Sequence, residues 1–162
     1  LSDASRLPIE SFFQHASRAI KEIRLGRLFM AFSLIRVQGR TVSFSSAGMP
    51  PAFLFRQSSG TTEEIFLKGM PLGAMKNARY AVQDVAMDPG DTLLFITDGL
   101  PEQKNAGGEM YDYARVQQAF GASLPGDPDS IIRHLVQAGD AWMDDAAQDD
   151  DITFLVIQRT SA

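Results

Sequence analysis

Residues 91–102, Asp-Thr-Leu-Leu-Phe-Ile-Thr-Asp-Gly-Leu-Pro-Glu, place an Asp-Gly turn directly after an apolar run. Residues 148–157, Gln-Asp-Asp-Asp-Ile-Thr-Phe-Leu-Val-Ile, place an acidic turn directly before a second apolar run. If the two runs are neighbouring antiparallel strands, the end of the first lies beside the start of the second. The carboxylates of Asp98, Asp150 and Asp151 then converge at one sheet edge, where their repulsion favours a bound divalent cation.

The composition limits the classes of protein to which the chain belongs. Its 162 residues fit a single domain over 1–162. A formal net charge of −5 argues against a nucleic-acid partner, which normally meets a basic face. The chain has no cysteine, so a disulfide framework, a thiolate zinc site and a cysteine nucleophile are excluded. No apolar stretch approaches the ~20 residues that span a bilayer, and we expect a cytoplasmic domain whose parent protein is free or membrane-tethered through an upstream domain.

Hydrophobic periodicity predicts a helix, a series of strands, two further helices and a last strand. Apolar residues recur every three or four positions over 8–25 and again after Pro128, which follows Asp127 as a helix cap. The run 27–37 is apolar on both faces and predicts a buried central strand, whereas 99–110 is expected to be irregular. Short links favour an antiparallel sheet system with helices on its outer faces. The other strands are expected at 41–46, 52–56, 64–68, 80–87, 91–97 and 152–159.

Seven short motifs follow one another along the chain. They are Gly26–Ala31, Ser46–Pro51, Pro71–Gly73, Pro89–Asp91, Thr97–Glu102, Asn105–Glu109 and Gln148–Thr153. In this order they resemble the SpoIIE/RsbU-type branch of the bacterial metal-dependent (PPM, type 2C-like) serine/threonine protein phosphatases. Each motif alone is weak, because Asp-Gly turns are common. The resemblance implies an α+β fold, an α-β-β-α layered antiparallel β-sandwich.

The resemblance also implies a centre of two Mn²⁺ or Mg²⁺ ions and hydrolysis of phosphoserine or phosphothreonine by a metal-bound water, without a catalytic side chain. On this resemblance Asp98 and Asp150 match metal-binding aspartates, and Asp151 occupies a neighbouring position where relatives carry Asn. Gly99 then turns the backbone tightly beside the ion. Glu102 is not expected to bind the ion itself. It is expected to contact a residue that binds the ion.

The chain departs from the family pattern at two places. The family's upstream Asp-x-(Ser/Thr)-Gly-His-Gly motif is absent, so we expect an N-terminally truncated domain that holds half of the metal site, binds metal weakly and has little activity. In the expected substrate loop, Gly48 is followed by Met49, where many relatives carry His. A non-catalytic, degenerate phosphatase fold that serves as a regulatory protein-interaction module is therefore the alternative function.

The partners expected from the resemblance are those of a signalling phosphatase. They are a phosphorylated, anti-anti-sigma-factor-like regulatory protein, an upstream sensor or receiver domain in the parent chain, and a second copy of the chain in a homodimer joined through an exposed sheet edge. The acidic run also has a simpler interpretation, since Asp144, Asp145 and Asp149 are expected to be solvated. The only two histidines, His15 and His134, match no metal-binding spacing.

Overall fold

The computed structural model describes residues 8–23, 28–75, 77–144 and 146–160. The described strands form two antiparallel sheets, and the chain is α+β as expected. In chain order the elements are α1 (Ile9–Ile23), β1 (Phe32–Gln38), β2 (Thr41–Ala47), β3 (Ala52–Arg56), β4 (Thr61–Ile65), β5 (Gln83–Ala86), β6 (Thr92–Ile96), α2 (Gly99–Glu102), α3 (Asp112–Ala122), α4 (Pro128–Met143) and β7 (Phe154–Gln158).

The chain divides into two compact units, each with one sheet and its own helices. The first unit comprises residues 1–49 and 67–86, and the second comprises 50–66 and 87–162. The expected single domain over 1–162 stays a prediction. No helix of the described residues is long and apolar enough to cross a membrane.

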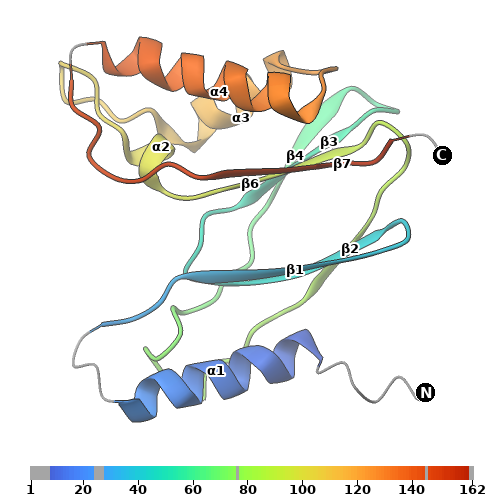
Figure 1. Cartoon of the computed structure of the whole chain (residues 1–162), viewed down its shortest axis with the longest axis vertical. Coiled ribbons are helices and arrows are strands. Elements are labelled where there is room, and N and C mark those ends of the chain that lie inside the picture. The colour runs from blue at the N-terminus through green and yellow to red at the C-terminus, as the bar shows by residue number, and fades with distance from the viewer. Residues whose placement is uncertain (1–7, 24–27, 76, 145, 161–162) are drawn as a thin grey trace. The chain divides into compact units, whose positions relative to one another are not determined.

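In the first unit, α1 packs on a sheet of strand order β1-β2-β5 (Figure 1). The apolar face predicted for this helix is the face that contacts the sheet. Ile9 and Phe13 are buried there against Ala47 of β2 and Tyr80, and the rings of Phe13 and Tyr80 lie 5.0 Å apart. The periodicity of residues 8–25 therefore identified the helix and most of its buried face, whereas Ile23, which was expected on that face, is 63% exposed.

The strand expected over 27–37 is wrong in its bounds and its place in the sheet. β1 begins at Phe32, and within the described strands it is an edge strand with one partner, β2. Its side chains are half-buried or exposed, and Val37 is 57% exposed. Apolar residues on both faces of this strand therefore did not indicate a central position in the sheet. Residue 27, where the strand was expected to begin, belongs to the range 24–27, which lies outside the described residues.

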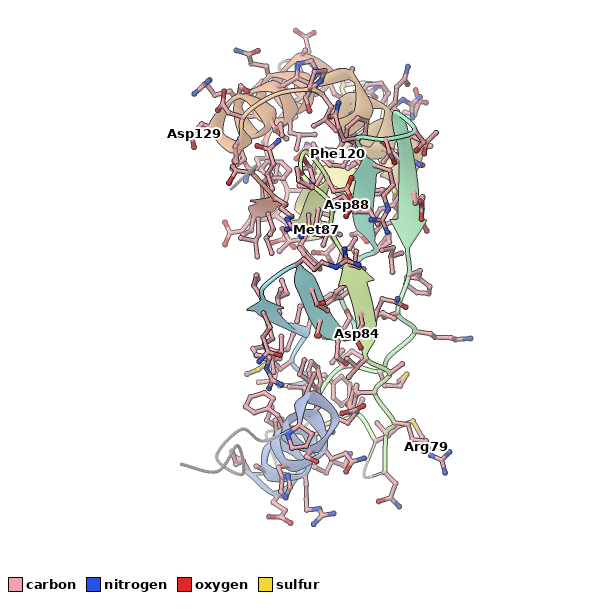
Figure 2. All side chains as sticks on the ribbon, turned by 90° about the vertical axis from the view of Figure 1, so that its right-hand side faces the viewer. Arg79, Asp84, Met87, Asp88, Phe120 and Asp129 are labelled. Atoms are coloured by element: carbon pink, nitrogen blue, oxygen red, sulfur yellow. The ribbon has the colours of Figure 1, made fainter. Side chains whose placement is uncertain are left out.

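In the second unit, α3 and α4 lie on one face of a sheet of order β4-β3-β6-β7 (Figure 1). The core between helices and sheet includes Phe53 of β3, Leu94 of β6, Phe120 of α3 and Leu135 of α4, each fully buried. Figure 2 shows Phe120 directed from α3 toward the strands. This helix layer holds the sheet whose ends carry the acidic turns.

Helix α4 begins as the sequence predicts. Asp127 is extended and its carboxylate accepts a hydrogen bond from the backbone N–H of Ser130 at 3.0 Å, with Pro128 in the first turn. Two other predictions are wrong: β4 covers 61–65 instead of 64–68, and residues 99–102 form the short helix α2 inside the segment 99–110 that was expected to be irregular.

Candidate metal centre

Strands β6 and β7 are antiparallel neighbours, which confirms the pairing predicted from the two apolar runs. The register places Ile96 opposite Phe154. One residue further on, the backbone N–H of Thr97 donates to the carbonyl of Thr153 at 3.2 Å. The end of β6, which leads to the Asp-Gly turn, therefore lies beside the start of β7, which follows the acidic turn.

The Thr97 hydroxyl connects these two turns through two hydrogen bonds. It donates to the carbonyl oxygen of Asp151 at 3.1 Å and accepts from the backbone N–H of Thr153 at 2.9 Å. One side chain next to the Asp-Gly turn thus satisfies backbone groups on both sides of Ile152. The backbone beside Asp98 is held against the backbone of Asp151.

Gly99 lies against the same carbonyl. A Cβ atom built on Gly99 would stand 2.4 Å from the carbonyl oxygen of Asp151, so any side chain here would force the two turns apart. Helix α2 begins at this glycine, and the N–H of Glu102 donates to the carbonyl of Asp98 at 3.0 Å. The expectation of a tight turn at Gly99 agrees with this contact, whereas its position beside an ion stays a prediction.

The carboxylates of both turns are exposed. Asp98, Glu102, Asp150 and Asp151 all reach solvent, and Asp150 Oδ1 accepts from the backbone N–H of Asp151 at 2.7 Å. Among the described residues, no ion pair to any of these four residues is found. Their oxygens are therefore not neutralised by a neighbouring lysine or arginine of the described chain.

The donor set for a metal ion is incomplete. In the described part of the chain, no group of three or more His, Cys, Asp or Glu side chains is arranged to hold a metal ion. Aspartate oxygens suit Mn²⁺ or Mg²⁺ chemically, but two adjacent turns alone do not enclose an ion that takes six ligands. Metal binding by Asp98, Asp150 and Asp151, and the contribution of Glu102, stay predictions.

Gln103 organises the acidic turn and was not singled out by sequence reasoning. Its side chain is buried, with Nε2 donating to the carbonyls of Lys104 at 3.0 Å and Ala147 at 3.1 Å. Its Oε1 accepts from the backbone N–H of Asp149 at 3.2 Å. Because Gln103 directly follows α2, it connects the segment that begins at Asp98 with the segment that leads to Asp150.

The backbone of Gln103 is held as firmly as its side chain. Its carbonyl accepts from the indole Nε1 of Trp142 at 3.2 Å and from the N–H of Tyr111 at 2.9 Å. The rings of Trp142 and Tyr111 meet edge to face, and the guanidinium of Arg115 lies 4.4 Å from the Trp142 ring centroid. A lone glutamine in a segment without periodicity carries no sequence signal for this role.

Tyr113 of α3 also adjoins the acidic edge. Its pKa is raised, first by burial and then by the negative charges of Glu102, Asp98 and Glu64. The shift favours the protonated phenol, which is a hydrogen-bond donor. Sequence reasoning missed Tyr113, because only the fold of α3 brings it near residues of β4 and α2.

The expected substrate loop belongs to the other unit. Gly48 has a φ of +70°, its N–H donates to the carbonyl of Gly69 at 2.9 Å, and an added Cβ would lie 2.6 Å from Pro71. This close approach requires glycine, whatever the loop binds. Contact of Gly48 and Met49 with a substrate stays a prediction.

Comparison with known families decides the identity of this fold. The sequence profile of the family described as Stage II sporulation protein E (SpoIIE) matches residues 3–160. The chain belongs to the SpoIIE family. The resemblance read from the seven ordered motifs is confirmed, and the SpoIIE family is one of phosphatase domains.

Two curated relatives show that SpoIIE-family domains form part of longer proteins. The chain is 25% identical over 128 residues to Protein IcfG of Synechocystis sp., covering 79% of the chain and 20% of that protein. It is 22% identical over 117 residues to Phosphoserine phosphatase RsbU of Bacillus subtilis, covering 72% of the chain and 34% of that protein. The chain therefore spans a fifth to a third of the length of these relatives.

Solved structures agree with the SpoIIE-family fold. The structure of the RsbU and RsbW domains of Rv1364c from Mycobacterium tuberculosis gives a TM-score of 0.69 at 19% identity, over 97% of this chain and 43% of that one. The Mn-presoaked phosphatase domain of Bacillus subtilis SpoIIE gives 0.65 at 19% identity, over 98% and 68%. At these identities the likeness establishes the fold alone.

Proposed function

We propose that this chain is part of a metal-dependent phosphoprotein phosphatase domain that hydrolyses phosphoserine or phosphothreonine. The main support for the proposal is that the turn at Asp98 contacts the turn at Asp151. The Thr97 hydroxyl donates to the carbonyl of Asp151, and Gly99 lies against the same carbonyl. Family membership supplies the reaction class, because the match covers residues 3–160. The geometry supplies two acidic turns at the same end of the neighbouring strands β6 and β7. No lysine or arginine of the described residues forms an ion pair with their carboxylates.

A pair of divalent cations supplies an activated water and neutralises phosphate charge when bound in such a domain. Asp98, Asp150 and Asp151 are the oxygen donors that this chain offers to Mn²⁺ or Mg²⁺. Glu102, on the first turn of α2, adds negative charge on the same side. Burial, and after it the charge of Glu102, raises the pKa of Tyr113. The remaining ligands are expected from a segment of the parent protein with the Asp-x-(Ser/Thr)-Gly-His-Gly motif.

The proposed substrate is a phosphorylated regulatory protein of the anti-anti-sigma-factor type. RsbU is named a phosphoserine phosphatase, and PppA of Pseudomonas aeruginosa, with a TM-score of 0.67 at 18% identity, is described as a key regulatory component of T6SS. These names support a signalling role for the present chain. An upstream sensor or receiver domain is proposed with it, because the match covers only 20% of Protein IcfG and 34% of RsbU.

A second candidate function is a non-catalytic interaction module. The observation that favours it is the incomplete donor set, since the described residues contain no cluster of three metal-binding side chains. Met49 in place of a histidine points the same way. Such a module would keep the fold and its binding surfaces without hydrolysing phosphate esters.

Activity of the parent protein separates the two functions. We expect Mn²⁺-dependent hydrolysis of a phosphoserine peptide, and Asp98→Asn is expected to lower kcat/KM by roughly 100-fold. Asp129→Asn, on the exposed first turn of α4, is the matched control and should leave the rate unchanged. Absence of hydrolysis by the parent protein, or an Asp98→Asn variant as active as wild type, would favour the interaction module.

A further inference from the structure

A pocket of the second unit lies beside the acidic turns. It has a volume of about 450 Å³ and is lined by α2, α4 and the segment that leads into β7 (Figure 1). Ligand sites commonly have volumes of about 300–1,000 Å³. The pocket is therefore large enough for a ligand, and Asp98, Asp150 and Asp151 are not among its lining residues.

The floor of the pocket is apolar and belongs to the core of the second unit. Leu100 of α2 and Leu135 of α4 are 1% and 0% exposed, and both line the pocket. Gly139 brings α4 against α2, because a Cβ atom added there would stand 2.9 Å from Cδ1 of Leu100. The packing of the core thus sets the position of the floor.

The apolar face of α4 is wider than the surface that the core covers. Ile131 and Leu135 are fully buried, whereas Ile132 is half-buried and Val136 is 44% exposed. Ile132, Val136 and the half-buried Phe154 all line the pocket. Their uncovered apolar surface gains free energy when another apolar group displaces water from it.

The partial exposure of these walls favours a protein as the ligand. Sites for small molecules bury about 70–90% of the ligand surface. A small molecule against Val136 and Phe154 would stay exposed to solvent on one side. A side chain of a protein fits this pocket better, because the rest of that protein covers the mouth.

The surroundings of the pocket are negatively charged. Between residues 134 and 158 the chain has six aspartates and no lysine or arginine. Asp140 lines the pocket, and within the described residues its carboxylate forms no ion pair. Arg133 of α4 is not among the lining residues. A partner with a positive charge next to its apolar side chain therefore complements this surface.

Ile152 connects the pocket with the acidic turns. It lines the pocket, and a Cβ atom added at Gly99 would lie 3.1 Å from its Cγ1. Thr153 also lines the pocket, and its backbone N–H donates to the Thr97 hydroxyl at 2.9 Å. A protein with one side chain in the pocket therefore places neighbouring residues close to the acidic turns.

We propose that this pocket receives a large apolar side chain of the phosphorylated protein substrate, next to a lysine or arginine of that substrate. The inference rests on the proposed function, because the pocket can select substrates only if phosphate esters are hydrolysed at the adjacent turns. The pocket takes no part in the hydrolysis. It raises the affinity for phosphoproteins that carry this pair of residues at a suitable distance from the phosphorylated residue.

Steady-state kinetics of the parent protein with Mn²⁺ tests the proposal on synthetic phosphoserine peptides. A Leu-Arg pair is placed at successive distances on either side of the phosphoserine, and matched peptides carry Ser-Ser instead. p-Nitrophenyl phosphate, which has no side chain for the pocket, is the reference substrate. For at least one spacing, the Leu-Arg pair is expected to raise kcat/KM, relative to the reference, by about tenfold, mainly through a lower KM.

Substitutions on α4 separate the apolar and the charged parts of the pocket. Val136→Lys should remove the advantage of the Leu-Arg pair, because the lysine stem covers the pocket and its charge repels the arginine. Asp140→Asn should lower only the preference for arginine, by about threefold. Gln137→Lys, at the next and exposed position of α4, is the matched control and should keep the full advantage, since residue 137 does not line the pocket.

The reference substrate distinguishes failure of this inference from failure of the proposed function. If p-nitrophenyl phosphate is hydrolysed but no spacing gives an advantage, or Val136→Lys retains it, the inference is overturned alone. Absence of hydrolysis of every substrate overturns the proposed function and the inference with it. A dimer that Val136→Lys dissociates, without a change in peptide kinetics, would overturn the inference in favour of a second copy of the chain.

Discussion

At the scale of single residues, a few side chains decide how the acidic turns meet. Thr97 and Gly99 were visible in the sequence, because an Asp-Gly turn after an apolar run is a recognisable pattern. The structure adds that both residues contact the backbone of Asp151, across 54 positions of sequence for Thr97. Gln103 could not be predicted, since its partners at 147 and 149 are set by the return of the chain to β7.

Gly99→Ala is expected to destabilise the fold by about 1–3 kcal/mol, because its Cβ would overlap the carbonyl oxygen of Asp151. Urea unfolding measures the loss. Gly121→Ala in α3 is the control: its Cβ meets nothing closer than 3.5 Å, and alanine should stabilise the helix by up to about 1 kcal/mol. Equal stability of Gly99→Ala and wild type would show that the two turns are not in contact.

Gln103→Met should cost about 2 kcal/mol, because the change leaves the carbonyl of Ala147 and the N–H of Asp149 without their partner. Hydrogen exchange at the Asp149 amide should accelerate more than exchange in α3. Gln137→Met, on the exposed face of α4, should alter neither quantity. If the Asp149 amide keeps its protection in Gln103→Met, the glutamine does not hold the acidic turn.

At the scale of elements, the sequence predicted best where hydrophobic periodicity was long. Helix α1, helix α4 and the pairing of β6 with β7 follow from apolar spacing and a cap. β4 was misplaced because the apolar residues Ile65, Phe66 and Leu67 suggested a strand, whereas Phe66 is 60% exposed and the ladder to β3 ends at Ile65. Pairing with a neighbouring strand outweighed local hydrophobicity.

Asp91 joins β3 to the turn before β6. Burial by itself would raise its pKa, but hydrogen bonds from the N–H of Asp88, from Arg56 and from the N–H of Gln57 outweigh burial and lower it from 3.8. Since the folded-state pKa lies below the unfolded value, the stabilisation is complete above pH 3.8 and is lost as the pH falls through the folded-state pKa.

Asp91→Asn should therefore lose about 2–3 kcal/mol at neutral pH, because Arg56 loses its buried counter-charge. The difference from wild type should shrink below pH 3.8. Thermal unfolding between neutral and acid pH measures both effects. Asp84→Asn, an exposed change on β5, should stay within about 0.5 kcal/mol of wild type at every pH. A pH-independent deficit in Asp91→Asn would contradict the electrostatic explanation.

At the scale of the whole molecule, the ordered motifs predicted the family and the two-sheet α+β fold, and both are confirmed. Metal ligation could not be settled from the motifs, because an ion needs donors that converge in space as well as in sequence order. The residues of the expected site are divided between two units, with Gly48 and Met49 in one and both acidic turns in the other.

The edge of β1 predicts self-association. Among the described strands β1 has only β2 as a partner, and Leu28, Phe29 and Val37 are more than half exposed on or near it. Unpaired edges with apolar side chains promote pairing with another copy. Sedimentation should detect a dimer that Val37→Lys weakens, whereas Arg133→Gln should not. A wild-type chain that stays monomeric at high concentration would contradict this.

The central claim is that Asp98 and Asp150 offer oxygens to one cation centre, and substoichiometric Mn²⁺ tests it through paramagnetic broadening of amide NMR signals. The expected result is selective, simultaneous broadening of residues 97–99 and 149–152, abolished by Asp98→Asn and by Asp150→Asn. Broadening of only one of the two turns, or broadening that both variants retain, would contradict the claim.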